Sequence, residues 1–139
     1  MPVTHVVMFH LEVSAEAVAE VHAALVAARN DGGIEFDAVA LGTGLSRTVS
    51  DGGYGGAIQT GGFGARRLLV VTLADCAALD RYYEAPAHSV IRKRFLSQIS
   101  SEIAELYSKA DAEPRNSAMI YEAIETRAAD FMCRFDFEA

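Results

Sequence analysis

Cysteine, proline and tryptophan are scarce in this sequence, and each shortage narrows the class of protein. The 139 residues include two cysteines, three prolines and no tryptophan. Cys76 and Cys133 are far apart and form no CxxC pair, so we expect neither a disulfide framework nor a cysteine metal site. We interpret both as small buried hydrophobic residues in a reducing compartment.

Basic residues are also few. The chain has 12 Lys and Arg residues against 19 Asp and Glu residues, which gives a net charge of −7. Nucleic-acid binders normally present a basic face, so we expect no nucleic-acid partner, and no anionic membrane surface either. No apolar run approaches the roughly 18 residues of a membrane helix. Because residues 1–5 also lack the features of a signal peptide, a cytoplasmic location is expected.

Apolar residues, in contrast, make up 51% of the chain. A chain of this size buries roughly two-thirds of the surface that its unfolded form exposes. The composition therefore supports a folded core and makes disorder of the bulk of the chain improbable. We expect one domain over residues 1–139.

The first predicted strand, residues 3–12, is apolar on both of its faces. Strand alternation places His5, Val7, Phe9 and Leu11 on one face, and Val6, Met8, His10 and Glu12 on the other. Such a strand belongs to a sheet that is covered on both sides.

Helices and further strands follow in a regular order. Ser14 is a helix N-cap and Gly32 a C-terminal cap, and Asp75 caps a second, short helix. Strands are predicted over 34–45, 66–73 and 130–137, and longer helices over 86–109 and 116–129. This β-α-β-β-α-β order predicts an α+β ferredoxin-like fold, an antiparallel sheet with helices on one face.

The open face of that sheet requires a cover. A second copy of the chain is the simplest partner, because symmetric pairing buries the same surface twice. We therefore expect a homodimer, in the form of a dimeric α/β barrel.

Most glycines gather in a glycine-rich loop over 46–64. No amphipathic helix follows it, so a dinucleotide or phosphate loop is not expected. Two interpretations remain open, a flexible connection and a lid over a pocket.

Two segments resemble a known family. The sequence THVVMF occupies residues 4–9, and LDRYYEAPAH occupies residues 79–88 after a strand. These are similar to motifs of the stress-responsive A/B barrel family, within the dimeric α/β-barrel superfamily, over about residues 3–96. The chain departs from the pattern at Ala85, where the family often has histidine. It departs again in its longer glycine loop and in an extra helical insertion at about 107–129.

The resemblance implies an activity. In the olivetolic acid cyclase type of enzyme, a histidine and a tyrosine close a polyketide by an aldol reaction without a cofactor. The motifs place these catalytic roles on His88 and Tyr82, and the early strand histidine on His5. We also expect Val7, Phe9, Tyr83 and Phe95 to contact the substrate.

The residue chemistry agrees with those roles. Neutral imidazole is an effective base near pH 7, and a tyrosine hydroxyl stabilises an enolate oxygen. The alternative is that His88 only packs or caps the start of a helix. Adjacent helical residues point about 100° apart, so one of Tyr82 and Tyr83 should face the pocket.

Metal ions, cofactors and anionic groups are the other ligands to consider. His5 and His10 lie on opposite strand faces and no HxH or HxxxH pattern occurs, so we expect no metal and no cofactor. The basic run 92–94 either holds an anionic substrate group or forms a solvated helix face.

The combined prediction is a cytoplasmic small-molecule enzyme. It would perform cyclase, aldol-type or other proton-transfer chemistry on a polyketide-like carbonyl substrate, as a lyase of biosynthesis. A non-catalytic stress-response or ligand-binding dimer is the first alternative. A haem-dependent or cofactor-free oxygenase-like barrel is the second.

Overall fold

The main sheet has the strand order of a ferredoxin-like fold. The computed structural model describes residues 1–43, 47–50, 57–60 and 65–138. Its four-stranded antiparallel sheet has the order β2-β5-β1-β6, formed by β1 (Val3–His10), β2 (Ala38–Thr43), β5 (Ala65–Leu73) and β6 (Met132–Glu138). The first strand thus lies between the last strand and the third strand of the sheet, which confirms the predicted α+β fold.

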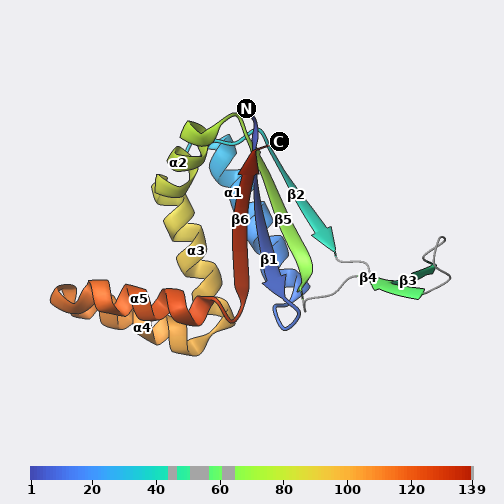
Figure 1. Cartoon of the computed structure of the whole chain (residues 1–139). Coiled ribbons are helices and arrows are strands. Elements are labelled where there is room, and N and C mark those ends of the chain that lie inside the picture. Colours follow the sequence, from blue (N-terminus) through green and yellow to red (C-terminus); the bar gives the residue numbers. More distant parts are fainter. Residues whose placement is uncertain (44–46, 51–56, 61–64, 139) are drawn as a thin grey trace.

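Three helices cover one face of this sheet (Figure 1). They are α1 (Ala15–Asn30), α2 (Cys76–Glu84) and α3 (Pro86–Ile99). The predicted caps are confirmed, because Ser14 Oγ accepts from the Ala17 amide and Asp75 accepts from the Ala78 amide. Gly32 adopts a positive φ of 77°, which favours glycine at the end of α1. The core between helices and sheet includes Phe9, Val18, Leu69 and Phe95.

A helical hairpin extends from the end of α3. It consists of α4 (Ser101–Ala112), a short 3₁₀ turn η1 (Pro114–Asn116) and α5 (Ser117–Ala128). Figure 1 shows the two helices side by side, projecting away from the sheet. They have a small core of their own, formed by Leu96, Ile103, Tyr107, Ala110, Ile120, Ile124 and Ala128.

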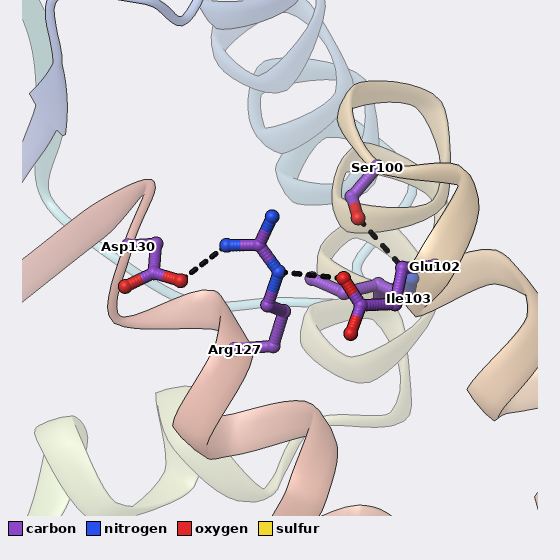
Figure 2. A network of polar contacts seen from close by, with 5 residues as sticks. All are labelled: Ser100, Glu102, Ile103, Arg127 and Asp130. Atoms are coloured by element: carbon purple, nitrogen blue, oxygen red, sulfur yellow. Dashed lines mark hydrogen bonds and ion pairs between the residues drawn. The ribbon is translucent and has the colours of Figure 1, made fainter.

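Polar contacts connect the two ends of the hairpin (Figure 2). Arg127 Nε donates to Glu102 at 2.8 Å, and the same guanidinium pairs with Asp130. Ser100 Oγ accepts from the Ile103 amide at 3.2 Å. The contacts join the start of α4 to the end of α5 and to the turn that leads into β6.

The prediction of one helix over 86–109 is wrong. The chain leaves the helical conformation at Ser100, which has φ −145° and ψ 115° and caps α4 with its hydroxyl. The apolar stripe is divided as a result: Phe95 packs on the sheet, and Ile103 packs within the hairpin. The spacing alone did not reveal this break, because a serine N-cap interrupts the backbone without interrupting the apolar pattern.

Two other expectations need correction. The strand over 34–45 is shorter and runs from Ala38 to Thr43, while Ile34 and Phe36 enter the core from an irregular segment. Cys76 and Cys133 are exposed rather than buried. Cys133 alternates with Met132 on β6, which puts it on the sheet face without helices.

The glycine-rich loop is described in part. Residues 47–50 (β3, Arg47–Ser50) and 57–60 (β4, Ala57–Thr60) form a separate antiparallel pair, so part of the predicted loop is strand. Its remaining residues up to 64, with the glycines at 52, 53, 55, 56, 61, 62 and 64, lie outside the described part. The lid interpretation therefore stays a prediction.

The sheet face opposite the helices is apolar. The register places Val6 beside Val70 and Phe135, and Thr4 beside Phe137. Phe135 and Phe137 are 47% and 46% exposed, and their rings stack with centroids 5.9 Å apart. Two exposed phenylalanines on one strand are an unusual feature of a surface that faces water.

No helix in the described part of the chain is both long enough and apolar enough to cross a membrane.

Candidate functional site

A cavity of about 50 Å³ lies between the sheet and the helices. Its lining comes from three strands and three helices: His5, Val7, Phe9, Val21, Leu25, Leu69, Tyr82, His88, Ile91, Arg92, Phe95, Met132 and Arg134. Six of the seven predicted site residues are in this set. Tyr83 is not in the lining, but its hydroxyl reaches the ring of His5.

Local structure explains how these residues come together. Alternation along β1 turns His5, Val7 and Phe9 toward the helices. The α2 helix ends at Glu84 and α3 begins with Pro86, with Ala85 alone between them, so Tyr82 in the last turn of one helix approaches His88 in the first turn of the next. Their ring centroids are 5.0 Å apart.

The two tyrosines take different positions around the histidines. Tyr82 is buried in the cavity lining, with its ring centroid 5.4 Å from that of His5. Tyr83 is half-buried and lies beside the cavity, 5.2 Å from the His5 ring and 5.6 Å from the His88 ring. One tyrosine faces the cavity, as helical geometry requires, and the second supports the histidines from the side.

A carboxylate holds His5 in place. Asp136 Oδ1 lies 2.6 Å from His5 Nδ1, and the Tyr83 hydroxyl donates to Asp136 Oδ2 at 2.9 Å. A carboxylate has no proton to donate, so this arrangement assigns the ring proton of His5 to Nδ1. The lone pair of neutral His5 is then on Nε2, and Asp136 fixes the ring orientation as a carboxylate does in a hydrolase triad.

Burial keeps both histidines neutral near pH 7. Burial and, to a lesser extent, the positive charges of Arg134 and Arg92 together lower the pKa of His88 to about 4. Burial also lowers the pKa of His5, although the hydrogen bond and charge of Asp136 act in the opposite direction. Both imidazoles are therefore able to accept a proton.

The tyrosines remain hydrogen-bond donors. Burial raises the pKa of Tyr82 well above its usual range, so its hydroxyl stays protonated. Burial and the hydrogen bond to Asp136 do the same for the pKa of Tyr83. The cavity thus combines two proton acceptors with a hydroxyl donor in apolar surroundings.

Two arginines border the cavity. The Arg92 guanidinium makes two hydrogen bonds to Glu125, at 2.6 and 2.9 Å. The Arg134 guanidinium lies over the Tyr83 ring, 5.3 Å from its centroid. In the basic run 92–94, Lys93 pairs with Asp111 and Arg94 is exposed, so the described structure brings Arg92 alone from that run to the cavity.

Sequence reasoning gave no role to Asp136 and Arg134. The signal was present, since alternation placed Met132, Arg134 and Asp136 on the face of the last strand opposite the phenylalanines. What the sequence did not supply is the pairing of β6 with β1, which places Asp136 opposite His5 and Arg134 opposite Val7.

The other histidines lie away from this site. His10 Nδ1 accepts from the Glu12 amide at 3.2 Å, and His22 is half-buried on α1. Among the described residues, no group of three or more His, Cys, Asp or Glu side chains is arranged to hold a metal ion.

Replacing Asp136 by asparagine should lower the pKa of His5 further. The carboxylate now raises that pKa through its charge and hydrogen bond, while burial lowers it, so its loss leaves burial unopposed. Ring-proton NMR across a pH series measures the change directly. The exposed Asp111→Asn variant is the matched control, and an unchanged or raised His5 pKa in Asp136→Asn would contradict the assigned pairing.

Comparison with known proteins supports the fold. No protein-family model matches the chain, and no curated protein sequence matches it. A dimeric ferredoxin-like protein of unknown function from Jannaschia sp. CCS1 is 16% identical, with a TM-score of 0.57 and 100% of both chains covered. A crystal structure of a protein from Arabidopsis thaliana is 18% identical, with a TM-score of 0.51 over 99% of this chain and 94% of that one.

Proposed function

We propose that this protein is a cofactor-free enzyme that moves a proton at a carbon next to the carbonyl group of a small substrate. The observation that carries the proposal is the convergence of His88, His5 and Tyr82 on one small, largely apolar cavity. The motifs at residues 4–9 and 79–88, which resemble the stress-responsive A/B barrel family, add support. Cyclisation and aldol-type condensation both begin with this proton transfer.

The proposed steps follow from the geometry. Neutral His88 takes a proton from the carbon beside the carbonyl, and the electron pair moves onto the carbonyl oxygen. The Tyr82 hydroxyl donates a hydrogen bond to that enolate oxygen. The enolate carbon then attacks a second carbonyl in the substrate, and protonated His88 returns its proton to the new alkoxide. Atoms and charge balance without a cofactor.

The size of the cavity limits the substrate. At about 50 Å³ it is far smaller than the several hundred Å³ of a pocket for a drug-sized ligand. A long polyketide would require the side chains around it to move. We therefore propose a short carbonyl compound, which narrows the cyclase prediction made from the sequence.

We also propose that the chain forms a homodimer through its open sheet face. The exposed Phe135 and Phe137 lie on that face, and the similar protein from Jannaschia is described as dimeric. The cavity lies on the opposite, helix-covered side of the sheet. The partner would then stabilise the sheet without contributing a side chain to the cavity.

A ligand-binding dimer without catalysis is the alternative, and one observation favours it. A histidine whose pKa is about 4 accepts protons weakly, because base strength falls with pKa. Such a cavity would suit the binding of a small carbonyl compound without turnover.

Deuterium exchange separates the two functions. Levulinate and its uncharged amide each carry carbon-bound protons beside a ketone, and NMR in D₂O follows their replacement. The enzyme proposal predicts exchange of at least one of the two probes roughly a hundredfold above the protein-free rate. Binding of a probe without faster exchange would leave the ligand-binding dimer as the function.

A further inference from the structure

An outer groove lies next to the inner cavity. This groove, of about 180 Å³, lies between the end of α5 and β6. It is lined by Arg92, Glu125, Ala128, Ala129, Met132, Cys133 and Arg134. Arg92, Met132 and Arg134 line both spaces, so they form the boundary between the cavity and the groove.

Among the described residues, Arg134 at this boundary has no ion pair. No carboxylate in that part of the chain pairs with it, whereas Arg81 and Arg92 each pair with one carboxylate and Arg127 pairs with two. The nearby carboxylates are already engaged: Asp136 by His5 and Tyr83, and Glu125 by Arg92. Both carboxylates keep their negative charge, so the attraction for an anion comes from the N–H donors of the Arg134 guanidinium, which are unpaired in the described structure, and not from a net positive charge.

The two guanidinium groups are also held in place. Arg134 is exposed to the groove while its plane lies over the Tyr83 ring. The Arg92 side chain is 16% exposed and fixed by Glu125, and its buried Nε has no hydrogen-bond partner among the described residues. A guanidinium held in this way suits the planar, two-oxygen geometry of a carboxylate.

We infer that the site takes a small carbonyl compound that also carries a carboxylate. The carboxylate binds Arg134 in the outer groove, and the carbonyl reaches the inner cavity beside His88 and Tyr82. The carbonyl end of this inference rests on the proposed function, while the carboxylate end rests on the groove alone. Arg134 is on the helix-facing side of β6, so a dimer through the opposite face leaves it accessible.

Binding of the carboxylate would also strengthen the base. The charged and titratable groups around His88 are His5 from β1, Tyr82 and Tyr83 from α2, Arg92 from α3 and Arg134 from β6. Burial is the main cause of the low pKa of His88, and the charge of Arg134 acts in the same direction. A bound carboxylate offsets the charge of Arg134 but not the burial, so binding of the acid should raise the pKa of His88 and make it a stronger base.

Matched probes and variants test this inference. NMR titration should show levulinate binding roughly ten- to a hundredfold more tightly than levulinamide, since a hydrogen-bonded ion pair is lost with the amide. Arg134→Gln should reduce that preference to near unity. The control Arg94→Gln removes the same charge from an exposed position on α3 and should leave the preference intact.

The outcomes distinguish this inference from the proposed function. Equal affinity for the two probes, a preference that survives Arg134→Gln, or no saturable binding of levulinate would each overturn the carboxylate assignment. Exchange into levulinamide as fast as into levulinate would overturn it as well, and would leave the enzyme proposal standing. Selective levulinate binding that depends on Arg134, without exchange, would support the site and refute the enzyme.

Discussion

Replacing His88 by asparagine is expected to remove most of the roughly hundredfold acceleration of levulinate exchange, so that the rate falls close to the protein-free value. Asparagine keeps a polar side chain of similar reach at the start of α3, but it has no lone pair basic enough to take a carbon-bound proton. NMR in D₂O measures the rate for the wild-type and variant proteins. Binding of levulinate should change far less than the rate, because the carboxylate contacts are retained.

His22→Asn is the matched control for this variant. His22 is half-buried on α1 and is not in the cavity lining, so the same substitution there should preserve the rate. If His88→Asn keeps most of the activity and His5→Asn loses it, the base is His5. Its contact with Asp136 would then have the role that a carboxylate has beside a catalytic histidine.

The pH dependence gives a second check on His88. With a pKa of about 4, His88 is neutral and able to act as a base at higher pH, and it loses this ability as the pH falls through that value.

The same pKa shift also affects the stability of the fold. Between the ordinary histidine pKa of 6.5 and about 4, the unfolded chain takes up a proton that folded His88 does not. The free energy of unfolding therefore falls as the pH drops through this window, and His88→Asn should lose less of it.

Local patterns predicted much of the candidate site. Strand alternation placed His5, Val7 and Phe9 on one face, and the family motif singled out Tyr82 and His88. These residues meet because each is fixed by its own strand or helix and by the short connection between α2 and α3. The order of the elements and the short connection are therefore almost enough to predict that these side chains meet.

Long-range pairing accounts for what the sequence did not predict. Asp136 lies 131 positions from His5 in the chain, and its contact depends on the register between β1 and β6. A shift of one residue would turn Asp136 and Arg134 to the other face and bring the phenylalanines toward the helices. The break at Ser100 has a similar origin. The change of direction is stabilised by packing in the hairpin core between α4 and α5, which the apolar spacing does not reveal.

The largest expected change in assembly comes from replacing Phe135 by lysine. Phe135 is near the middle of β6, its side chain lies on the open face beside Val6, and it is 47% exposed in the single chain. If a second copy covers this face, the substitution places an unpaired charge in an apolar interface. Central aromatic residues of interfaces contribute about 2–4 kcal/mol, so the dimer should dissociate at roughly 30- to 1000-fold higher concentration.

Mass measurement in solution tests this expectation. The wild-type protein should show twice the single-chain mass of 14.9 kDa, and Phe135→Lys should move toward the single-chain value. Met119→Lys is the control, because Met119 is 74% exposed on α5, away from the open face. A wild-type mass near that of one chain, or a variant that remains dimeric, would contradict the proposed interface. The monomeric variant should still exchange levulinate, because the cavity lies on the helix-covered side of the sheet, away from the open face. A loss of exchange in a folded monomer would show that the partner completes the site.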